Sequence, residues 1–214
     1  MTKVIAIDGP ASVGKSTLAK KFSKKFKVPV LYSGKLYRAV ALEIITRKVN
    51  LNNTKEILKC VTYIDLDNLS SEKLYSSEVD EVSSIISAKK PLRNKLITYQ
   101  RSFPRKCGHK VKFAIIEGRD IGTIIFPRAD YKIFLWAASE VRAKRRYEQL
   151  RKNGKNASYS KIFREINLRD RKDMTRKIAP LMPAANSVLL DTTYIDIEQV
   201  FNALKKIILK TKTI

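Results

Sequence analysis

The residues best suited to chemistry form one short run near the N-terminus, Gly9, Pro10, Ala11, Ser12, Val13, Gly14, Lys15 and Ser16, which fits GxxxxGK[ST]. In such a loop, glycines let the backbone curl so that its N–H groups point at phosphate oxygens, and the following helix adds its positive N-terminal end. Lys15 then reaches the β and γ phosphates, and the Ser16 hydroxyl is placed to bind a bridging Mg²⁺. Thr17 follows in the helix and completes the predicted triphosphate-binding run.

A triphosphate site alone leaves a hydrolase, a switch and a kinase open. A GTPase switch should carry an NKxD motif, but Leu96 and Ile97 follow the Asn94-Lys95 pair. Arginine is plentiful instead, because helical spacing places Arg142, Arg145 and Arg146 on one face and Arg169, Asp173 and Arg176 on another. Phosphoryl transfer spreads negative charge over the moving group, which suits arginine. The alternatives are a solvated face for the first set and pairing of Asp173 within its helix.

The elements that must position these residues follow βαβ order. Apolar runs predict strands at 3–8, 29–32, 61–64, 111–117, 130–135 and 187–190, and helical patterns fill 14–26, 34–48, 54–60, 78–88, 91–104, 139–152, 158–176 and 196–210. Ser139 and Ser158 are the expected N-caps. The strand at 61–64 belongs to a polar segment, 61–77, that we interpret as an insertion. We predict an α/β, P-loop NTPase-type fold, with a five-stranded parallel sheet and helices on both faces.

Parallel strands bring their carboxyl ends to one edge of the sheet, where ligands bind. The Gly-rich loop, Tyr32-Ser33-Gly34 and Glu117-Gly118-Arg119-Asp120 each follow a strand, so we expect them to meet at one site. Asp8 ends the first strand, and we interpret it as a brace for the loop.

Composition narrows the class of protein. The 214 residues, 44% of them hydrophobic, suit one domain, and no apolar run approaches the ~20 residues that span a bilayer. We therefore expect a cytoplasmic protein. The two cysteines and one histidine offer no zinc-site spacing, so metal binding must rely on oxygen ligands. The net charge of +24 suggests a nucleic-acid-binding protein. However, the lysines around Phe22 and Phe26 resemble a solvated helix face, and no nucleic-acid-binding motif is present.

Four long segments of this sequence resemble the bacterial cytidylate kinases, which are CMP/dCMP kinases of the nucleoside monophosphate kinase group. They are IAIDGPASVGKST at 5–17, YSGKLYRAVAL at 32–42, EGRDIGTIIFPRADYKIFLWAASEVRAKRRYEQL at 117–150 and RDRKDMTRKIAPLMPAANSVLLDTT at 169–193. The resemblance implies one P-loop kinase domain over 1–214, with an NMP-binding region at about 33–105 and a lid at about 142–160. It also implies transfer of the γ phosphate of ATP to CMP or dCMP with Mg²⁺, in pyrimidine nucleotide metabolism.

The resemblance further implies residue roles. CMP would be bound at its sugar and phosphate by Ser33, Tyr37, Arg38, Arg119 and Arg169, at its ribose by Asp173 and Arg176, and at its base by Ser84, Arg93 and Asp120. An amine-facing acceptor such as Asp120 favours cytosine over uracil by about 1–3 kcal/mol. Catalysis would fall to Lys15, Arg119, Arg142, Arg146 and Arg169, with Ser16 and, through water, Glu117 at the metal. We expect a monomer with ATP and CMP or dCMP as partners, and neither a membrane nor a specific nucleic acid.

The sequence departs from this family at two places. Tyr32 stands where the family usually has aspartate, which leaves the arrangement around the acceptor open, and the 61–77 segment is short. Two other functions also stay open: a P-loop kinase for UMP or a non-nucleotide acceptor, and a basic nucleic-acid-binding ATPase suggested by the charge.

Overall fold

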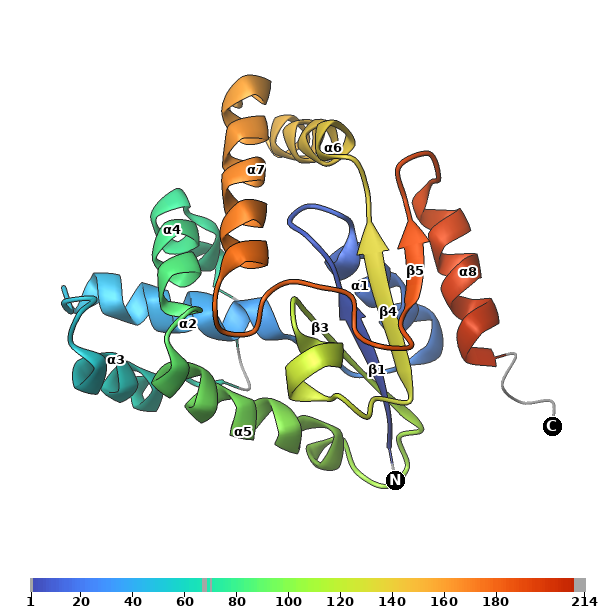
Figure 1. The fold of residues 1–214 in the computed structure, drawn as a ribbon, viewed down its shortest axis with the longest axis horizontal. Helices are drawn as coiled ribbons and strands as arrows, with labels where there is room; N and C mark the ends of the chain where they lie inside the picture. The colour runs from blue at the N-terminus through green and yellow to red at the C-terminus, as the bar shows by residue number, and fades with distance from the viewer. Residues whose placement is uncertain (1, 67–68, 70, 210–214) are drawn as a thin grey trace. The chain divides into compact units, whose positions relative to one another are not determined.

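The computed structural model describes residues 2–66, 69 and 71–209, which form two compact units (Figure 1). The first unit is built from the segments Met1–Leu31 and Pro104–Ile214, and the second from Tyr32–Phe103. The second unit has nearly the bounds of the NMP-binding region expected at 33–105. Its role in binding a nucleotide stays a prediction.

A five-stranded parallel sheet forms the core of the first unit, as predicted. Its strands are β1 (Lys3–Asp8), β2 (Val30–Tyr32), β3 (Phe113–Gly118), β4 (Tyr131–Trp136) and β5 (Val188–Asp191), in the order β2-β3-β1-β4-β5. The central strand β1 pairs in parallel with β3 and with β4, so Asp8 lies beside Gly118 on one side and Phe134 on the other. From Val4 onward β1 is buried, which is typical of a parallel strand covered on both faces.

The helices of this unit are α1 (Lys15–Phe26), α6 (Ser139–Lys152), α7 (Tyr159–Thr175) and α8 (Ile197–Leu209). Phe22 of α1 packs against Phe201 of α8 with ring centroids 5.9 Å apart. A single π-helical turn, η3 (Ile121–Ile125), follows β3, a turn that the sequence patterns do not predict. In Figure 1, α1 lies behind the strands of the sheet.

The second unit is helical. It contains α2 (Ser33–Thr46), α3 (Thr54–Cys60), the 3-10 turns η1 (Val61–Tyr63) and η2 (Glu72–Tyr75), α4 (Ser77–Ile86) and α5 (Lys90–Lys106). The predicted strand at 61–64 is wrong, because η1 continues from α3 and the Thr62 hydroxyl donates back to the Lys59 carbonyl at 2.7 Å. A β-branched segment forms a strand only where a neighbouring strand can pair with it. Part of the expected insertion, residues 67, 68 and 70, lies outside the described residues.

The two predicted helix caps have different outcomes. Ser158 caps α7, since its side chain accepts from the Lys161 N–H at 3.5 Å. Ser139 does not cap α6, because Ala138 is the N-cap residue and makes no side-chain capping bond. The Ala138 N–H donates instead to the Thr193 hydroxyl at 3.0 Å, so a residue beyond β5 holds the start of α6.

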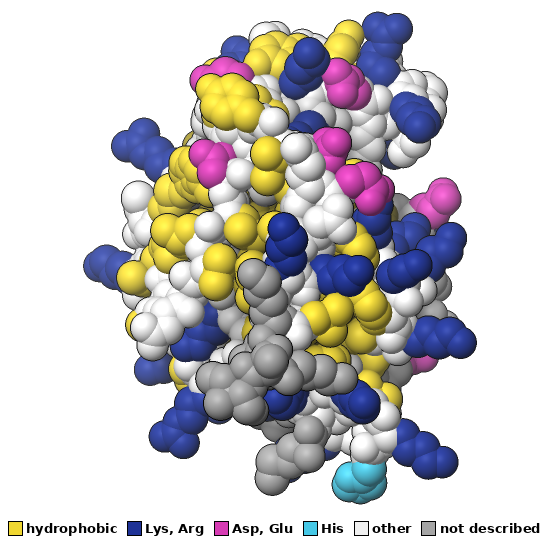
Figure 2. All heavy atoms as spheres, turned by 90° about the vertical axis from the view of Figure 1, so that its right-hand side faces the viewer, with side chains coloured by type: hydrophobic (Ala, Val, Ile, Leu, Met, Phe, Trp, Pro, Cys, Tyr) yellow, Lys and Arg dark blue, Asp and Glu magenta, His cyan; other side chains and the backbone are white. Residues whose placement is uncertain are grey.

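The basic side chains are spread over the surface that Figure 2 shows rather than gathered in one patch. Lys20, Lys24, Lys25 and Lys27 are exposed, as a solvated helix face requires. Figure 2 shows lysine and arginine side chains spread among apolar and acidic ones on the face turned to the viewer. Among residues 2–66, 69 and 71–209, no helix is both long and apolar enough to cross a membrane.

Candidate functional site

The Gly-rich loop follows β1 at the carboxyl edge of the sheet, and its backbone needs glycine at two positions. Gly9 has φ +149°, and a Cβ there would lie 2.3 Å from the Leu135 carbonyl oxygen of β4. Gly14 has φ +99° where the loop enters α1. Ser12, between them, is also left-handed at φ +58°. These angles curl the loop around the start of α1.

Lys15 is buried in this loop. Its Nζ donates to the carbonyl oxygens of Gly9 at 2.9 Å and Pro10 at 2.8 Å, so the ammonium lies within the curl of the loop. Burial and the neighbouring Arg119 guanidinium lower the pKa of Lys15 to about 7, against the attraction of Glu117 and Asp8, and Arg169 adds to the lowering. Burial and neighbouring cations disfavour the charged form of Lys15, and a bound anion such as a phosphate would stabilise that form.

Ser16 and Glu117 bring two oxygen ligands together. The Ser16 hydroxyl donates to Glu117 Oε2 at 3.1 Å, and Glu117 is buried at the end of β3. This confirms that the Gly-rich loop and the segment after β3 meet. Hydroxyl and carboxylate oxygens are the donors that Mg²⁺ prefers, so these two residues fit the metal that a triphosphate brings. Among the described residues, no group of three or more His, Cys, Asp or Glu side chains could hold a metal alone.

A buried ion pair clamps the middle of the Gly-rich loop. The Ala11 N–H donates to Asp170 Oδ1 at 3.0 Å, and the Ala11 carbonyl accepts from Arg142 Nη1 at 3.0 Å. Arg142 also pairs with Asp170 Oδ2 and donates from Nε to the Ala137 carbonyl at 2.8 Å. Both polar groups of Ala11 are therefore held by side chains from α6 and α7. Arg142 is 3% exposed, so a solvated face is the wrong interpretation for it.

The other two arginines of α6 behave differently. Arg145 Nη2 donates to the Thr192 carbonyl at 2.5 Å, and Nη1 donates to the Thr192 hydroxyl at 3.1 Å, which anchors the chain after β5. Burial lowers the pKa of Arg145. Arg146 donates to Gln149 Oε1 at 3.0 Å in an exposed hydrogen bond. Arg145 and Arg146 are both half-buried, so the three arginines of this helix have three different sets of partners.

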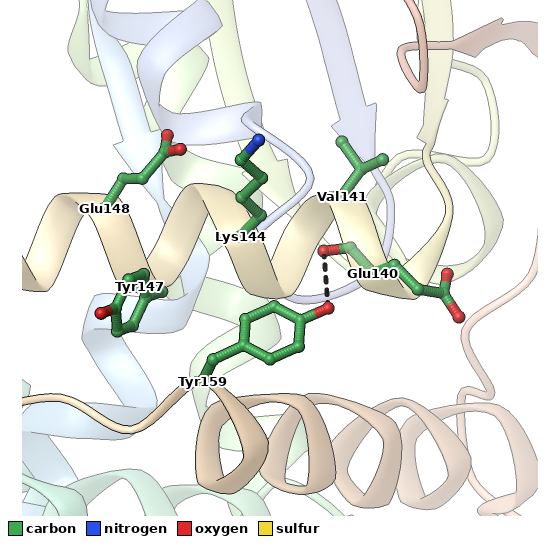
Figure 3. A pocket seen from close by; sticks show the side chains of 6 residues that line it. All are labelled: Glu140, Val141, Lys144, Tyr147, Glu148 and Tyr159. Atoms are coloured by element: carbon green, nitrogen blue, oxygen red, sulfur yellow. Dashed lines mark hydrogen bonds between the residues drawn. The ribbon is translucent and has the colours of Figure 1, made fainter.

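The expected lid region, 142–160, is a pair of helices with its own small core. Ala143, Ile162 and Ile166 are buried there, and Tyr147 and Phe163 pack against them. A cavity of about 490 Å³ opens beside this core, lined by Glu140, Val141, Lys144, Tyr147, Glu148 and Tyr159. Figure 3 shows Tyr159 reaching from the start of α7 to α6, where its hydroxyl donates to the Glu140 carbonyl at 3.5 Å. The motion of this pair as a lid stays a prediction.

Four predicted acceptor-site residues gather where β3 and α7 end. Arg119 Nε donates to Asp173 Oδ2 at 3.1 Å, and Arg176 lies 3.6 Å from Asp173 Oδ1 and 3.9 Å from Asp120 Oδ1. Asp120 and Asp173 are both buried. Asp173 thus pairs with Arg176, three residues further along the chain, as the alternative required, and also with Arg119, which directly follows β3. Two carboxylates and two guanidiniums lie together, which suits a ligand with hydroxyl and phosphate groups. Arg169 is half-buried on α7.

Asp8 holds the turn that carries Asp120. Its two oxygens accept from the Ile121 N–H at 2.9 Å and the Gly122 N–H at 2.7 Å. It therefore braces η3 rather than the Gly-rich loop that we expected. Burial raises the pKa of Asp8 to about 7, although the Gly122 and Ile121 N–H groups oppose the rise.

The second unit contains the remaining predicted residues. Ser33 begins α2, and Tyr37 and Arg38 follow within two turns. Arg38 Nη1 donates to the Leu74 carbonyl at 2.7 Å, and Nη2 pairs with Asp80. Arg93 of α5 is buried, donates to the Ser87 carbonyl at 2.9 Å and lies 5.8 Å from the Tyr37 ring centre. Ser84 is half-buried on α4. Whether Ser33 joins the Gly-rich loop at one site stays a prediction.

Two buried residues with long-range hydrogen bonds, Asp170 and Gln100, were not predicted from the sequence. Asp170 directly follows Arg169 in the RDRKD segment, but no local sequence pattern predicts its bond to Ala11, which is 159 residues away. Gln100 of α5 is buried and accepts from the Ser33 hydroxyl at 2.7 Å. The only available signal for Gln100 was a polar residue among the apolar positions of its helix.

Comparison with known proteins decides the family. A family model described as "Cytidylate kinase" matches residues 5–210, which is nearly the whole chain. The chain belongs to the cytidylate kinase family. It is 37% identical to a cytidylate kinase of Fusobacterium nucleatum over 98% of both chains, and 38% identical to one of Agrobacterium fabrum over 97% of both. A cytidylate kinase of Bartonella quintana is 40% identical over 92% of this chain and 90% of its own. Family membership makes the protein a nucleoside monophosphate kinase, an enzyme of the transferase class.

Solved structures support the same architecture. An uncharacterized protein from Eubacterium ventriosum superposes with a TM-score of 0.54 at 13% identity, covering 97% of this chain and 98% of its own. A sugar kinase from Janibacter sp. superposes with a TM-score of 0.50 at 12% identity, covering 96% and 94%. At such low identity these likenesses concern the fold alone.

Proposed function

We propose that this protein transfers the γ phosphate of ATP to CMP or dCMP and releases ADP with CDP or dCDP. The observation that carries the proposal is the first unit's pairing of a lysine-bearing phosphate loop with the Arg119–Asp173–Arg176–Asp120 cluster, in a chain of this family. In the reaction, an acceptor phosphate oxygen bonds to the γ phosphorus, and the bond from that phosphorus to the β-bridging oxygen breaks. The acceptor oxygen is already anionic at neutral pH, so no protein base is required.

On the donor side, we assign ATP to the loop Gly9–Ser16 and Thr17, with the Lys15 ammonium turning from the Gly9 and Pro10 carbonyls to the phosphates. Ser16 would hold Mg²⁺, and Glu117, already bonded to Ser16, would hold it through water. When bound, the metal neutralises charge on the β and γ phosphates. Asp170 and Arg142 keep Ala11 fixed, so the loop N–H groups are aligned before ATP arrives.

On the acceptor side, the roles that the family resemblance implies are kept residue by residue. We assign the sugar and the phosphate to Ser33, Tyr37, Arg38, Arg119 and Arg169, with Asp173 and Arg176 as further groups that hold the ribose. Cytosine would be read by Ser84, Arg93 and Asp120. Burial of Arg93 and Asp120 supports this assignment, because a buried donor and a buried acceptor penalise a base that cannot pair with them. Arg38 would exchange its Asp80 partner for phosphate.

Catalysis in this proposal is positioning and charge stabilisation. Lys15, Arg119 and Arg169 would face the transferred group, and Arg146, half-buried on α6, would reach it when the α6–α7 pair closes and excludes water. Arg142 contributes through its hold on the loop. We further propose that the protein acts as a cytoplasmic monomer, without a nucleic-acid partner.

A coupled assay of ADP release tests the function. We expect rapid release with CMP and ATP, and only background release with ATP alone. The exposed-charge alternative, a nucleic-acid-stimulated ATPase, predicts release with RNA or DNA that falls steeply as salt rises. Release that requires RNA and ignores CMP would refute the proposal. Lys15→Met is the matched control. It should abolish ADP release, whether that release depends on CMP or on nucleic acid, and so exclude a contaminating enzyme.

A further inference from the structure

A buried amide in the second unit lacks half of its hydrogen bonds. Gln100 lies in the middle of α5 with 0% exposure, and its Oε1 accepts from the Ser33 hydroxyl at 2.7 Å. Its Nε2 is buried and has no hydrogen-bond partner among residues 2–66, 69 and 71–209. Leaving a buried donor unsatisfied costs folding free energy, so such a group in a native protein needs an explanation.

The position of this amide supplies one. Ser33 is the first residue of α2, a helix of 14 residues, and the first turn contains no acidic side chain. The N-cap residue, Tyr32, makes no side-chain capping bond. The start of such a helix has N–H groups that favour an anion. The Gln100 donor and the helix end are separate observations: the first needs a hydrogen-bond acceptor, and the second favours one with negative charge.

The Ser33 hydroxyl limits which ligand groups can bind at the start of α2. Ser33 has one O–H, and it is directed to Gln100 Oε1, so its oxygen is left as an acceptor only. A phosphate dianion offers acceptors and no donor. At this end of α2, the Gln100 amide is therefore a neutral side chain able to donate to a phosphate oxygen, in addition to the Tyr37 hydroxyl that we assign there.

We propose that Gln100 binds the phosphate of the monophosphate acceptor through Nε2, while its Oε1 fixes the Ser33 hydroxyl. The proposal rests on the proposed function. Gln100 thus performs two tasks: it determines the direction of the Ser33 proton, and it recognises a phosphate-bearing acceptor. An unphosphorylated nucleoside leaves this donor unsatisfied.

Gln100→Glu is the sharpest test, because it preserves the acceptor for Ser33 and replaces only the donor. At about pH 8 we expect the KM for CMP to rise tenfold or more, because a hydrogen bond to the phosphate is replaced by repulsion between two anions. The KM for ATP should stay unchanged. Lowering the pH protonates a buried carboxyl and restores an O–H donor of the same shape. The ratio of the variant KM to the wild-type KM should therefore fall toward one as the pH falls.

Two further variants complete the design. Gln100→Met removes both bonds and should raise the KM for CMP about tenfold without any pH rescue. Ser33→Ala keeps the Gln100 donor, so any rise in its KM for CMP should show no dependence on the protonation of a residue at position 100. A CMP-induced increase in melting temperature, measured for each variant, reports binding independently of turnover.

The inference is overturned if both Gln100 variants keep a KM for CMP within about twofold of wild type, a difference too small for a lost hydrogen bond. It is equally overturned if the Gln100→Glu ratio is the same at every pH. Failure of the proposed function is distinguishable, because then wild-type protein itself releases no ADP with CMP.

Discussion

Removing the carboxylate that clamps the Gly-rich loop should weaken ATP binding as well as the fold. In Asp170→Asn, the side chain keeps its shape and loses its charge, so the buried Arg142 guanidinium loses its ionic partner. Breaking a buried ion pair typically costs about 3–5 kcal/mol, and we expect the free energy of unfolding to fall by about 3 kcal/mol. Urea titration of the variant measures this loss.

The effect on ATP follows from Ala11. Its N–H and carbonyl are held at 3.0 Å each by Asp170 and Arg142, and both side chains are buried. Asp170→Asn keeps one oxygen that can accept from Ala11, but its amide N–H group faces Arg142 and weakens the hydrogen bond from Arg142 to the Ala11 carbonyl. Hydrogen bonds to charged groups are worth about 1.5–3 kcal/mol, so we expect the KM for ATP to rise by up to about 10-fold to 100-fold. The KM for CMP should change little. Lys172→Gln, at an exposed position of the same helix, is the matched control and should leave both values unchanged.

A double variant separates stability from positioning. Arg142→Met with Asp170→Leu removes both buried charges, and apolar replacement of a whole buried pair is often neutral for folding. We expect most of the unfolding free energy to return while the KM for ATP stays high, because nothing then holds Ala11. If Asp170→Asn or the double variant binds ATP as tightly as wild type, the clamp does not position the loop.

Three further outcomes follow from the same geometry. Gly9→Ala should abolish ATP binding measured by calorimetry, because its Cβ would meet the Leu135 carbonyl at 2.3 Å, whereas Gly34→Ala, with nothing within 4 Å, should preserve it. Since the pKa of Lys15 is lowered to about 7, ATP binding at about pH 8 should take up close to one proton in buffers of different ionisation enthalpy, and binding without uptake would contradict the buried lysine. The raised pKa of Asp8, about 7 against 3.8 unfolded, means that the native state holds an extra proton between these values. Stability relative to Asp8→Asn should therefore fall by up to about 4 kcal/mol as the pH rises from about 4 to above 7, and a pH-independent difference in urea titrations would refute this.

Much of the first unit was predictable because its signals are local. The loop from Gly9 to Ser16 lies between an apolar strand and an amphipathic helix, and parallel strands oblige Glu117 to end at the same edge. The contact between Ser16 and Glu117 then follows from topology.

The remaining features depend on partners far along the chain. Asp170 reaches Ala11 across 159 residues, and Gln100 reaches Ser33 across 67. Thr193 replaces Ser139 at the start of α6 from 55 residues away. Residues 61–64 have a strand-like composition, but they lie beside no strand of the sheet, and Val61–Tyr63 form a 3-10 turn instead. Periodicity reports which face is buried, and it does not report which polar groups meet there.

The most direct test of the account is the ratio of kcat/KM for CMP and dCMP to that for UMP, measured by coupled ADP release with saturating ATP. Cytosine offers an amine where uracil has a carbonyl, and leaving the buried Asp120 acceptor unpaired costs about 1–3 kcal/mol. We therefore predict that CMP and dCMP exceed UMP by about 5-fold to 150-fold. UMP turned over as efficiently as CMP would contradict the assignment of this chain as a cytosine-specific monophosphate kinase.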